Sequence, residues 1–229
     1  MKKSFYSIIA LISLIILSGC SSVPKEDHIK WSGVEKPNKI NELKGKTVAL
    51  VEIVDDFTHV YCSGVWLNGK ILTAAHCVDD NSEITYVLYE DFVGIGMNPR
   101  AYNKGTVVKR DEEEDLALIN VSGKRGNAST LGTSSVGDKV YMMGHLKGLW
   151  YTYMSGEISA KIDYLPFGMR PPQINTTFWQ VNGSTGKGMS GGGLFNEAGE
   201  LIGIASFIFK DNNVAFYIHN SEIKKFMEN

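Results

Sequence analysis

Two short stretches of the sequence carry side chains that can do chemistry. The apolar run ILTAA ends on His76 and Cys77, and the stretch GKGMSGGGLF surrounds Ser190 with glycines. Glycines at a tight turn let backbone N–H groups point outward at a bound group. A serine there can attack a carbonyl carbon while the N–H groups of Gly188 and Ser190 hold the resulting oxyanion. Taken alone, the second stretch is equally typical of a flexible loop that happens to contain a serine.

The order of the partners along the chain decides between folds for a serine nucleophile. Ser190 lies in a G-x-S-x-G pattern, which is typical of α/β-hydrolases. That fold requires the acid and the histidine after the serine. The chain offers only Asp211 and His219 there, on β-like segments with no room for a parallel sheet. This order is therefore excluded.

The opposite order places a histidine and an acid upstream of the serine. His76 is the candidate base, and Asp115 directly precedes the apolar run LALI. A buried carboxylate next to the ring would fix its tautomer and stabilise the imidazolium. The preceding residues 111–114 are interpreted as a solvated acidic turn. Asp79 and Asp80 are rivals, but they lie too close to His76 in sequence to approach its ring from behind.

The elements that must position these residues are mostly strands. From Thr47 onward the chain is a series of short runs rich in Val, Ile, Tyr, Phe and Thr, bounded by Gly, Asn, Asp and Ser. Their spacing of roughly ten residues predicts an all-β sandwich or barrel. One helix is expected at the C-terminus, where Ser221 can cap it and Ile223, Phe226 and Met227 share a face.

The N-terminus predicts export. Lys2 and Lys3 precede a short apolar core, which is typical of a secretory signal and shorter than the ~20 residues of a membrane span. The segment LSGC resembles a bacterial lipobox, which implies cleavage before Cys20 and a lipid on its sulfur; a plain signal peptide cut nearby is the alternative. We therefore expect a signal peptide over 1–19, a lipidated tether over 20–44 and a folded domain over 45–229.

The cysteines fit the same compartment. If Cys20 carries lipid, Cys62 and Cys77 remain as an even pair, and exported proteins usually join such pairs. A disulfide closing this loop is worth ~3 kcal/mol in the chain-entropy model. A zinc site built from these cysteines with His59 and His76 is the alternative. It is disfavoured because adjacent residues on an extended chain point to opposite sides.

Three segments together resemble a known family. TAAHC, DLALI and GMSGGG, in that order, resemble the signature segments of trypsin-like serine endopeptidases, and the flanks VGDKVYMMG, SGEISA and NEAGELIGI are similar to those of bacterial single-domain members. The resemblance runs from about Thr47 to the C-terminus. It implies two antiparallel six-stranded β-barrels, over 45–132 and 133–229, a short C-terminal helix, and a site in the cleft between the barrels.

The resemblance also implies roles for individual residues. His76 matches the general base, Asp115 its orienting acid and Ser190 the nucleophile, while the amides of Gly188 and Ser190 match the oxyanion hole. Cys62 and Cys77 match the disulfide that brackets the histidine loop. Two positions depart from the family pattern, and they are Met189, where the family has aspartate, and Gly193, where proline is common.

The resemblance assigns a primary substrate pocket as well. Ser184 matches its floor, and the other residues placed along it are Thr185, Ser206, Phe207, Ile208 and Val214. With no carboxylate at the floor, a basic substrate side chain would be buried unpaired. Ile208 and Val214, expected to face each other, narrow the slot for small or medium apolar residues. Glutamate preference is the rival, but the histidine that supports it in some relatives is Ala205 here.

These observations predict an exported, lipid-anchored serine endopeptidase of the bacterial cell envelope, facing the periplasm or exterior. We expect a monomer that acts on peptide or protein substrates, contacts the membrane through lipid on Cys20 and uses no metal or cofactor. The net charge is −2, and the charged residues form no long run of one sign, which excludes a nucleic-acid partner. The alternatives are a catalytically silent lipoprotein that uses the protease fold as a binding scaffold and an esterase with the same triad.

Overall fold

The structure is a computed structural model of the chain, and it describes residues 39–94, 98–166, 168, 171, 174–183, 185–209 and 213–229. The expected signal peptide, most of the tether with Cys20, and the pocket residue Ser184 lie outside the described residues. Within the described part of the chain, no helix is both long and apolar enough to cross a membrane.

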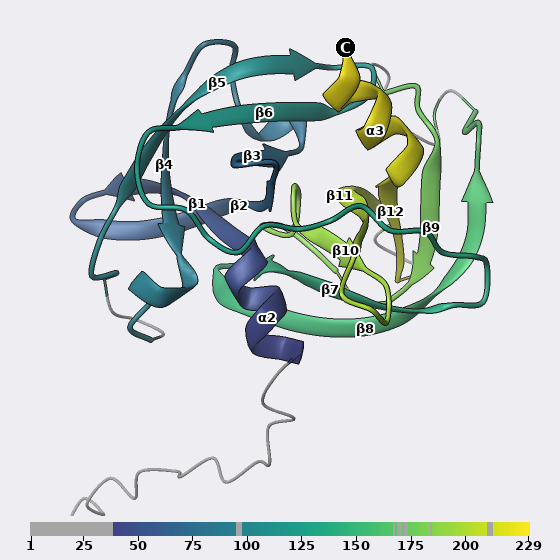
Figure 1. Cartoon of the computed structure of the whole chain (residues 1–229), viewed down its shortest axis with the longest axis horizontal. Helices are drawn as coiled ribbons and strands as arrows, with labels where there is room; N and C mark the ends of the chain where they lie inside the picture. The colour runs from purple at the N-terminus through teal and green to yellow at the C-terminus, as the bar shows by residue number, and fades with distance from the viewer. Residues whose placement is uncertain are drawn as a thin grey trace, which may run out of the picture. The chain divides into compact units, whose positions relative to one another are not determined.

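The first six strands form a closed antiparallel barrel in the order β1-β2-β3-β6-β5-β4 (Figure 1). Its strands are β1 (Thr47–Val54), β2 (Phe57–Leu67), β3 (Lys70–Thr73), β4 (Glu83–Leu88), β5 (Asn103–Asp111) and β6 (Leu116–Val121). Two short 3₁₀ turns, η1 (Ala75–Cys77) and η2 (Tyr89–Asp91), follow β3 and β4. The first of these turns carries the candidate base.

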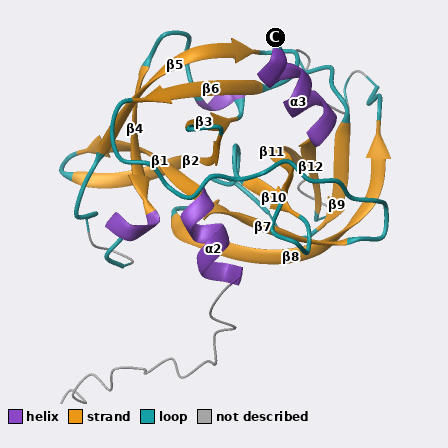
Figure 2. Cartoon of the chain, viewed as in Figure 1, coloured by secondary structure: helices purple, strands orange, loops and turns teal. Residues whose placement is uncertain are grey.

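The last six strands form a second closed antiparallel barrel in the order β10-β11-β12-β9-β8-β7. Its strands are β7 (Lys139–Leu146), β8 (Leu149–Ile162), β9 (Phe178–Asn182), β10 (Gly193–Phe195), β11 (Leu201–Phe209) and β12 (Val214–His219). Strands dominate both halves (Figure 2). The predicted all-β fold of two six-stranded barrels with a short C-terminal helix is confirmed.

Each barrel closes because its strands turn apolar side chains inward. One buried cluster fills the first barrel and includes Val48, Trp66 and Tyr86, and a second fills the other barrel and includes Met142, Val181 and Tyr217. A third cluster joins residues of both barrels, including Leu72, Leu116, Met143, Phe195 and Ile204. Burial of these apolar side chains, at roughly 25 cal/mol per Å² removed from water, holds the two barrels together.

Two helices flank the strands. α2 (Lys39–Lys46) begins inside the segment expected to be a tether. It is held because Leu43 is buried and the Lys46 ammonium donates to the Gly199 carbonyl at 2.8 Å. α3 (Asn220–Glu228) ends the chain, and its cap is the His219 ring, which accepts from the Ser221 N–H, rather than the Ser221 side chain that the sequence suggested.

Candidate active site

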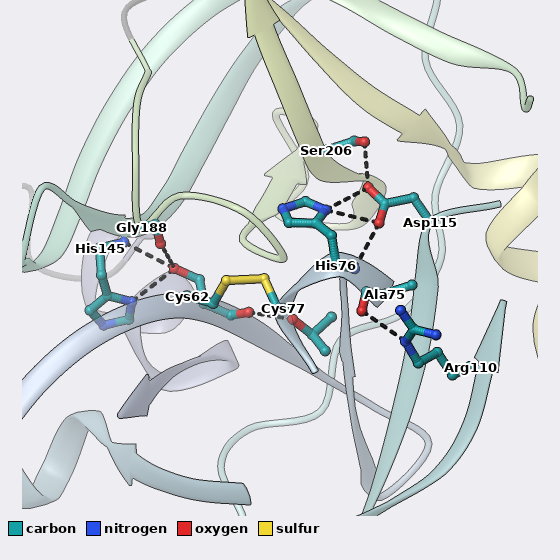
Figure 3. Close-up of a disulfide and its surroundings, with 11 residues drawn as sticks. Cys62, Ala75, His76, Cys77, Arg110, Asp115, His145, Gly188 and Ser206 are labelled. Atoms are coloured by element: carbon teal, nitrogen blue, oxygen red, sulfur yellow. Dashed lines mark hydrogen bonds and ion pairs between the residues drawn. A yellow bond between two sulfur atoms is a disulfide. The ribbon is translucent and has the colours of Figure 1, made fainter. Parts of the chain in front are cut away.

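A covalent bond and backbone hydrogen bonds hold the turn that carries His76. A disulfide joins Cys77 to Cys62 in β2, so these sulfurs are not free thiolates for a metal (Figure 3). The Ala75 N–H donates to the backbone carbonyl of Asp115 at 3.1 Å, and the Arg110 guanidinium donates to the Ala75 carbonyl at 3.1 Å. The turn is therefore tied to β2, to the start of β6 and to β5.

The Asp115 carboxylate faces the imidazole of His76 and is itself buried. Its two oxygens lie 2.9 and 3.0 Å from His76 Nδ1, and Oδ1 also accepts from the His76 backbone N–H at 3.1 Å. The Ser206 hydroxyl donates to Asp115 Oδ2 at 2.5 Å. A carboxylate that accepts from Nδ1–H leaves Nε2 as the proton acceptor of the ring, which is the tautomer a general base requires.

Asp111 of the acidic turn and the rival acid Asp80 make contacts elsewhere. Asp111 Oδ1 accepts from the N–H groups of Glu113 and Glu114, both at 2.9 Å, so it closes its own turn. Asp80 Oδ2 is 3.8 Å from the Arg110 guanidinium. The acidic turn is not fully solvated, because Glu114 is half-buried and burial raises the pKa of its carboxyl above the ordinary value.

Backbone hydrogen bonds and close glycine contacts hold the loop that carries Ser190 against β2. The Ser190 carbonyl accepts from the Ser63 N–H at 2.8 Å, and the Gly191 N–H donates to the Ala205 carbonyl at 2.8 Å. Gly191 has φ +79°, and a Cβ there would lie 2.1 Å from the Ser63 carbonyl oxygen. Only glycine lets the loop approach β2 this closely.

The backbone donors around Ser190 are used in different ways. The Met189 N–H donates to the Gly186 carbonyl at 3.1 Å, and the Gly192 N–H donates to the Met189 carbonyl at 2.8 Å. The N–H groups of Gly188 and Ser190, by contrast, donate no hydrogen bond to any described residue. These are the two amides that the sequence predicted for an oxyanion hole, and both are spare donors, free to bind a substrate oxygen.

A chain of short links joins the histidine turn to the serine loop. Cys77, which follows His76, is disulfide-bonded to Cys62. The residue after Cys62 is Ser63, and its backbone N–H donates to the Ser190 carbonyl. No hydrogen bond joins the His76 imidazole to the Ser190 hydroxyl in the described structure. Catalytic hydrogen bonds are often long in a free enzyme and tighten when substrate binds.

A pocket of about 220 Å³ opens beside Ser190. Four of the predicted pocket residues line it, namely Thr185, Ser206, Phe207 and Ile208, and the other described lining residues are Gly186, Lys187, Met189, Ser190, Ala205, Ala215, Phe216 and Tyr217. No carboxylate is among these described residues. Met189, which stands where the family has aspartate, is 1% exposed and belongs to the apolar cluster of the second barrel.

The expectation that Val214 faces Ile208 is wrong. In the pairing of β11 with β12, Val214 lies opposite Phe209 and Ala215 lies opposite Ile208, and Val214 is not among the pocket-lining residues. The register shifts between Ala205 and Phe207, which is where a bulge adds Ser206 to β11. Because side chains alternate along a strand, a one-residue difference in register exchanges the residue that faces the slot.

Sequence reasoning placed Ser206 in the pocket wall but missed its bond to the acid. A signal for it exists, since Ser206 is a hydroxyl inside the apolar run LIGIASFIF, and a buried polar group is costly unless it is hydrogen-bonded. The same signal marks His145 in the run VYMMGHL, which the sequence analysis also passed over. His145 is completely buried.

Comparisons with known proteins agree with this geometry. The family described as a trypsin-like peptidase domain matches residues 62–204. A probable periplasmic serine endoprotease, DegP-like, of Pseudomonas savastanoi pv. phaseolicola is 32% identical over 145 residues, which cover 62% of this chain and 27% of that protein. The serine endoprotease DegS of Salmonella typhimurium is 30% identical over 159 residues, covering 66% of this chain and 40% of that protein.

The fold is shared with solved proteases. The HtrA-type protease AlgW, solved with a tripeptide, superposes with a TM-score of 0.68 at 24% identity, covering 83% of this chain and 62% of that one. The chain thus spans between about a quarter and two fifths of the length of the two curated relatives, at 27% and 40%.

Proposed function

The chain belongs to the trypsin-like peptidase domain family, and we propose on that premise that it is a serine endopeptidase acting through His76, Asp115 and Ser190. One observation carries the proposal. The buried Asp115 carboxylate lies 2.9 and 3.0 Å from His76 Nδ1, on a turn that a disulfide and Ser63 link to the serine loop. A binding scaffold has no use for a histidine held in this way.

The proposed reaction follows from these contacts. Ser190 Oγ attacks the carbonyl carbon of the scissile peptide bond, and His76 Nε2 takes its proton. Asp115 stabilises the imidazolium that forms, and the spare N–H groups of Gly188 and Ser190 hold the oxyanion. The imidazolium then protonates the leaving amine. Water releases the acyl group from Ser190 in a second passage through the same steps.

The pocket supports a preference for small or medium apolar residues before the cut. The described lining residues include no carboxylate that would pair with a basic side chain, and Ile208 with Tyr217 and Met189 makes the walls apolar. Because Ala215 rather than Val214 lies opposite Ile208, Ile208 is the one branched side chain among the described residues of this pair of strands that narrows the pocket. Glutamate remains the rival, with Thr185 in the lining and Ala205 where supporting relatives carry histidine.

A fluorophosphonate probe tests the catalytic proposal. The purified wild type should be labelled, whereas Ser190→Ala should fold to the same circular dichroism spectrum and carry no label. Peptide turnover should fall on the order of 10⁶-fold, as in a dissected triad of another serine protease. A folded wild type that takes no label would favour the silent scaffold. Ester turnover without any peptide turnover would favour the esterase.

We also propose a lipid anchor in the cell envelope, since LSGC precedes Cys20 and the DegP-like relatives are described as periplasmic. Cys20 lies outside the described residues, so the proposal rests on sequence. Cys20→Ser should move the protein from the membrane fraction to the soluble fraction, because two or more acyl chains hold a protein firmly on a membrane. A membrane-bound Cys20→Ser protein would mean an uncleaved signal instead.

A further inference from the structure

A buried histidine near the end of β7 has no part in the triad. His145 is completely buried, and burial lowers the pKa of its imidazole to about 3, so the ring is neutral at physiological pH. Its Nε2 has no hydrogen-bond partner in the described structure, and the ring packs on Tyr151 at 4.6 Å between centroids. A buried polar ring is costly unless its other nitrogen makes a useful bond.

That bond goes to Ser63, which gathers three contacts at one hydroxyl. Ser63 Oγ lies 2.9 Å from His145 Nδ1, 2.7 Å from the Gly188 carbonyl oxygen and 3.1 Å from the His145 backbone nitrogen, which donates to it. A hydroxyl has one proton, and the carbonyl can only accept, so Ser63 donates to Gly188. His145 Nδ1 then carries the proton and donates to Ser63. This arrangement satisfies all three contacts at once.

Gly188 supplies one of the two spare amides, and the peptide groups on both sides of it are held. The carbonyl of Lys187 accepts from the Lys147 N–H at 2.7 Å, and the carbonyl of Gly188 accepts from Ser63 Oγ at 2.7 Å. In a trans peptide the N–H points opposite to the carbonyl. The first bond therefore aims the Gly188 N–H, and the second keeps the following peptide from rotating.

The loop that carries Ser190 also packs directly against the end of β7. Gly188 has φ +89°, and a Cβ there would lie 2.0 Å from the His145 carbonyl oxygen. Figure 3 shows the side chain of His145 and the carbonyl of Gly188 on one side of the disulfide, with His76, Asp115 and Ser206 on the other. The His76–Asp115 pair and the loop that carries Gly188 are thus held by separate contacts, on opposite sides of Cys62 in this view.

We propose that Ser63 and His145 are positioning residues for the oxyanion hole: His145 Nδ1–H fixes the Ser63 hydroxyl, and Ser63 holds the Gly188–Met189 peptide, which keeps Gly188 in the conformation that presents its N–H to the developing oxyanion. The inference rests on the proposed function and adds a task that the triad does not perform. Neither residue touches substrate. Their contribution is confined to the tetrahedral state, because the ground-state carbonyl has not yet developed the charge that the amide stabilises.

Three variants test the inference in the full-length protein. Ser63→Ala removes the donor to Gly188. His145→Leu removes the Nδ1 donor, whereas His145→Asn keeps an N–H at the same distance from the backbone and is the rescue variant. Ser129→Ala is the matched control, because Ser129 is also a buried serine and its hydroxyl has no partner among the described residues. Thermal unfolding and circular dichroism establish that each variant is folded.

The readout separates transition-state from ground-state binding. A peptide aldehyde ending in valine forms a tetrahedral adduct with Ser190 that needs the oxyanion hole, and the matching peptide acid does not. Loss of a direct oxyanion donor costs about 10²–10³-fold in kcat, and an indirect loss should cost less. For Ser63→Ala and His145→Leu we expect kcat and aldehyde affinity to fall together by about 10- to 100-fold. In these two variants, KM and the affinity for the peptide acid should change less than about threefold. In the His145→Asn and Ser129→Ala proteins, kcat and aldehyde affinity should also change less than about threefold.

The outcomes are distinguishable. A folded Ser63→Ala protein that keeps wild-type aldehyde affinity overturns the inference and leaves the proposed function intact. So does a His145→Asn protein that loses as much as His145→Leu, since the ring would then act by packing alone. If His145→Leu does not fold, Ser63→Ala still decides. A wild type that neither takes the fluorophosphonate nor cleaves peptides overturns the proposed function, and this inference falls with it.

Discussion

The two barrels hold their proposed catalytic residues by different means. In the first barrel, side chains do the holding, since the disulfide fixes the turn and the Asp115 carboxylate fixes the His76 ring. In the second barrel, backbone contributes most, since glycines let the Ser190 loop lie directly against β2 and the end of β7, where the Ser63 hydroxyl also holds it. A base must present one nitrogen in one tautomer, whereas an oxyanion hole must leave two N–H groups free.

Because the two barrels hold different parts of the site, hydrogen bonds cross the interface between them, which we call the seam. Ser63 of the first barrel donates to Ser190 of the second, and Ser206 of the second donates to Asp115 of the first. Away from the site, the Tyr151 hydroxyl donates to the Val87 carbonyl at 2.9 Å. Each half of the candidate site is therefore completed by a donor from the other barrel, and neither barrel alone contains all three proposed catalytic residues.

The largest expected effect tests whether the two halves act as one unit. His76→Ala and Ser190→Ala should each reduce kcat on the order of 10⁶-fold, and the double variant should be no worse than either single one. The reason is that the base has no function without the nucleophile, so their effects are not additive. Single-turnover kinetics on a valine-containing peptide measures all three. Losses that multiply would mean that the two residues contribute independently.

The next effect separates the acid of the first barrel from its neighbour. Asp115→Asn should reduce kcat roughly 10⁴-fold, because an amide favours the wrong tautomer of His76. Asp111→Asn, four residues earlier, is the matched control. It should change kcat little, since Asp111 only closes its own turn. Equal losses at the two positions would show that the acid has been wrongly chosen.

Sequence reasoning was strongest where a residue is constrained by its own neighbours. The all-β fold follows from the alternating apolar runs and their turn residues, and the family follows from three motifs in order. His76 and Asp115 do lie beside each other, and the sequence predicted this because His76 follows one apolar run and Asp115 directly precedes another. The disulfide between Cys62 and Cys77 fits an exported chain with an even pair.

What could not be predicted depends on residues from the other barrel. The apolar runs around Ser206 and His145 mark both as buried polar groups, but they do not reveal that the partners are Asp115 and Ser63. The error at Val214 has a similar cause, because the bulge in β11 changes which residue of β12 faces the pocket. Such features are set by strand register and by contacts distant in sequence, which local patterns do not encode.

Removing the disulfide tests how much this bond contributes to the stability of the first barrel, where it holds the histidine turn. The paired substitution Cys62→Ala and Cys77→Ala should lower the free energy of unfolding by ~3 kcal/mol, because the loop of about 15 residues gains freedom in the unfolded chain. Urea unfolding measures the change. Reductant should bring the wild type to the same stability and leave the variant unaffected. A variant as stable as the oxidised wild type would mean that backbone bonds alone hold the histidine turn.

A smaller effect concerns the pocket wall of the second barrel. Ile208→Gly should extend cleavage to larger residues such as Leu and Phe, with a change of about 1–3 kcal/mol in relative transition-state binding. Val214→Ala is the control and should leave the preference unchanged, because Val214 lies opposite Phe209 and outside the pocket. Competition between peptides of a library measures the ratio. Strong wild-type cleavage after Arg, Lys or Glu would contradict this pocket while leaving the triad untouched.

The smallest expected effect lies at the seam beside the acid, where Glu114 precedes Asp115. Burial raises the pKa of the Glu114 carboxyl, and the charges of Asp111 and Glu222 raise it further. One of its oxygens is buried without a hydrogen-bond partner in the described structure. Glu222 belongs to α3 of the second half of the chain, so the two carboxylates bring like charge to the seam.

The sign of the pH dependence follows from the raised pKa. The folded state favours protonated Glu114, so the wild type has its full stability at low pH and loses part of it as pH rises through the folded-state pKa. Glu114→Gln cannot ionise, and it should be slightly more stable than the wild type at pH 7, by less than about 1 kcal/mol because solvent screens the charges. Below about pH 4, where the unfolded carboxyl is also protonated, the gain should disappear. Urea unfolding from pH 3.5 to 7.5 measures it, with Glu113→Gln as the exposed control. A gain that persists at low pH would show that the substitution acts through packing rather than through charge at the seam.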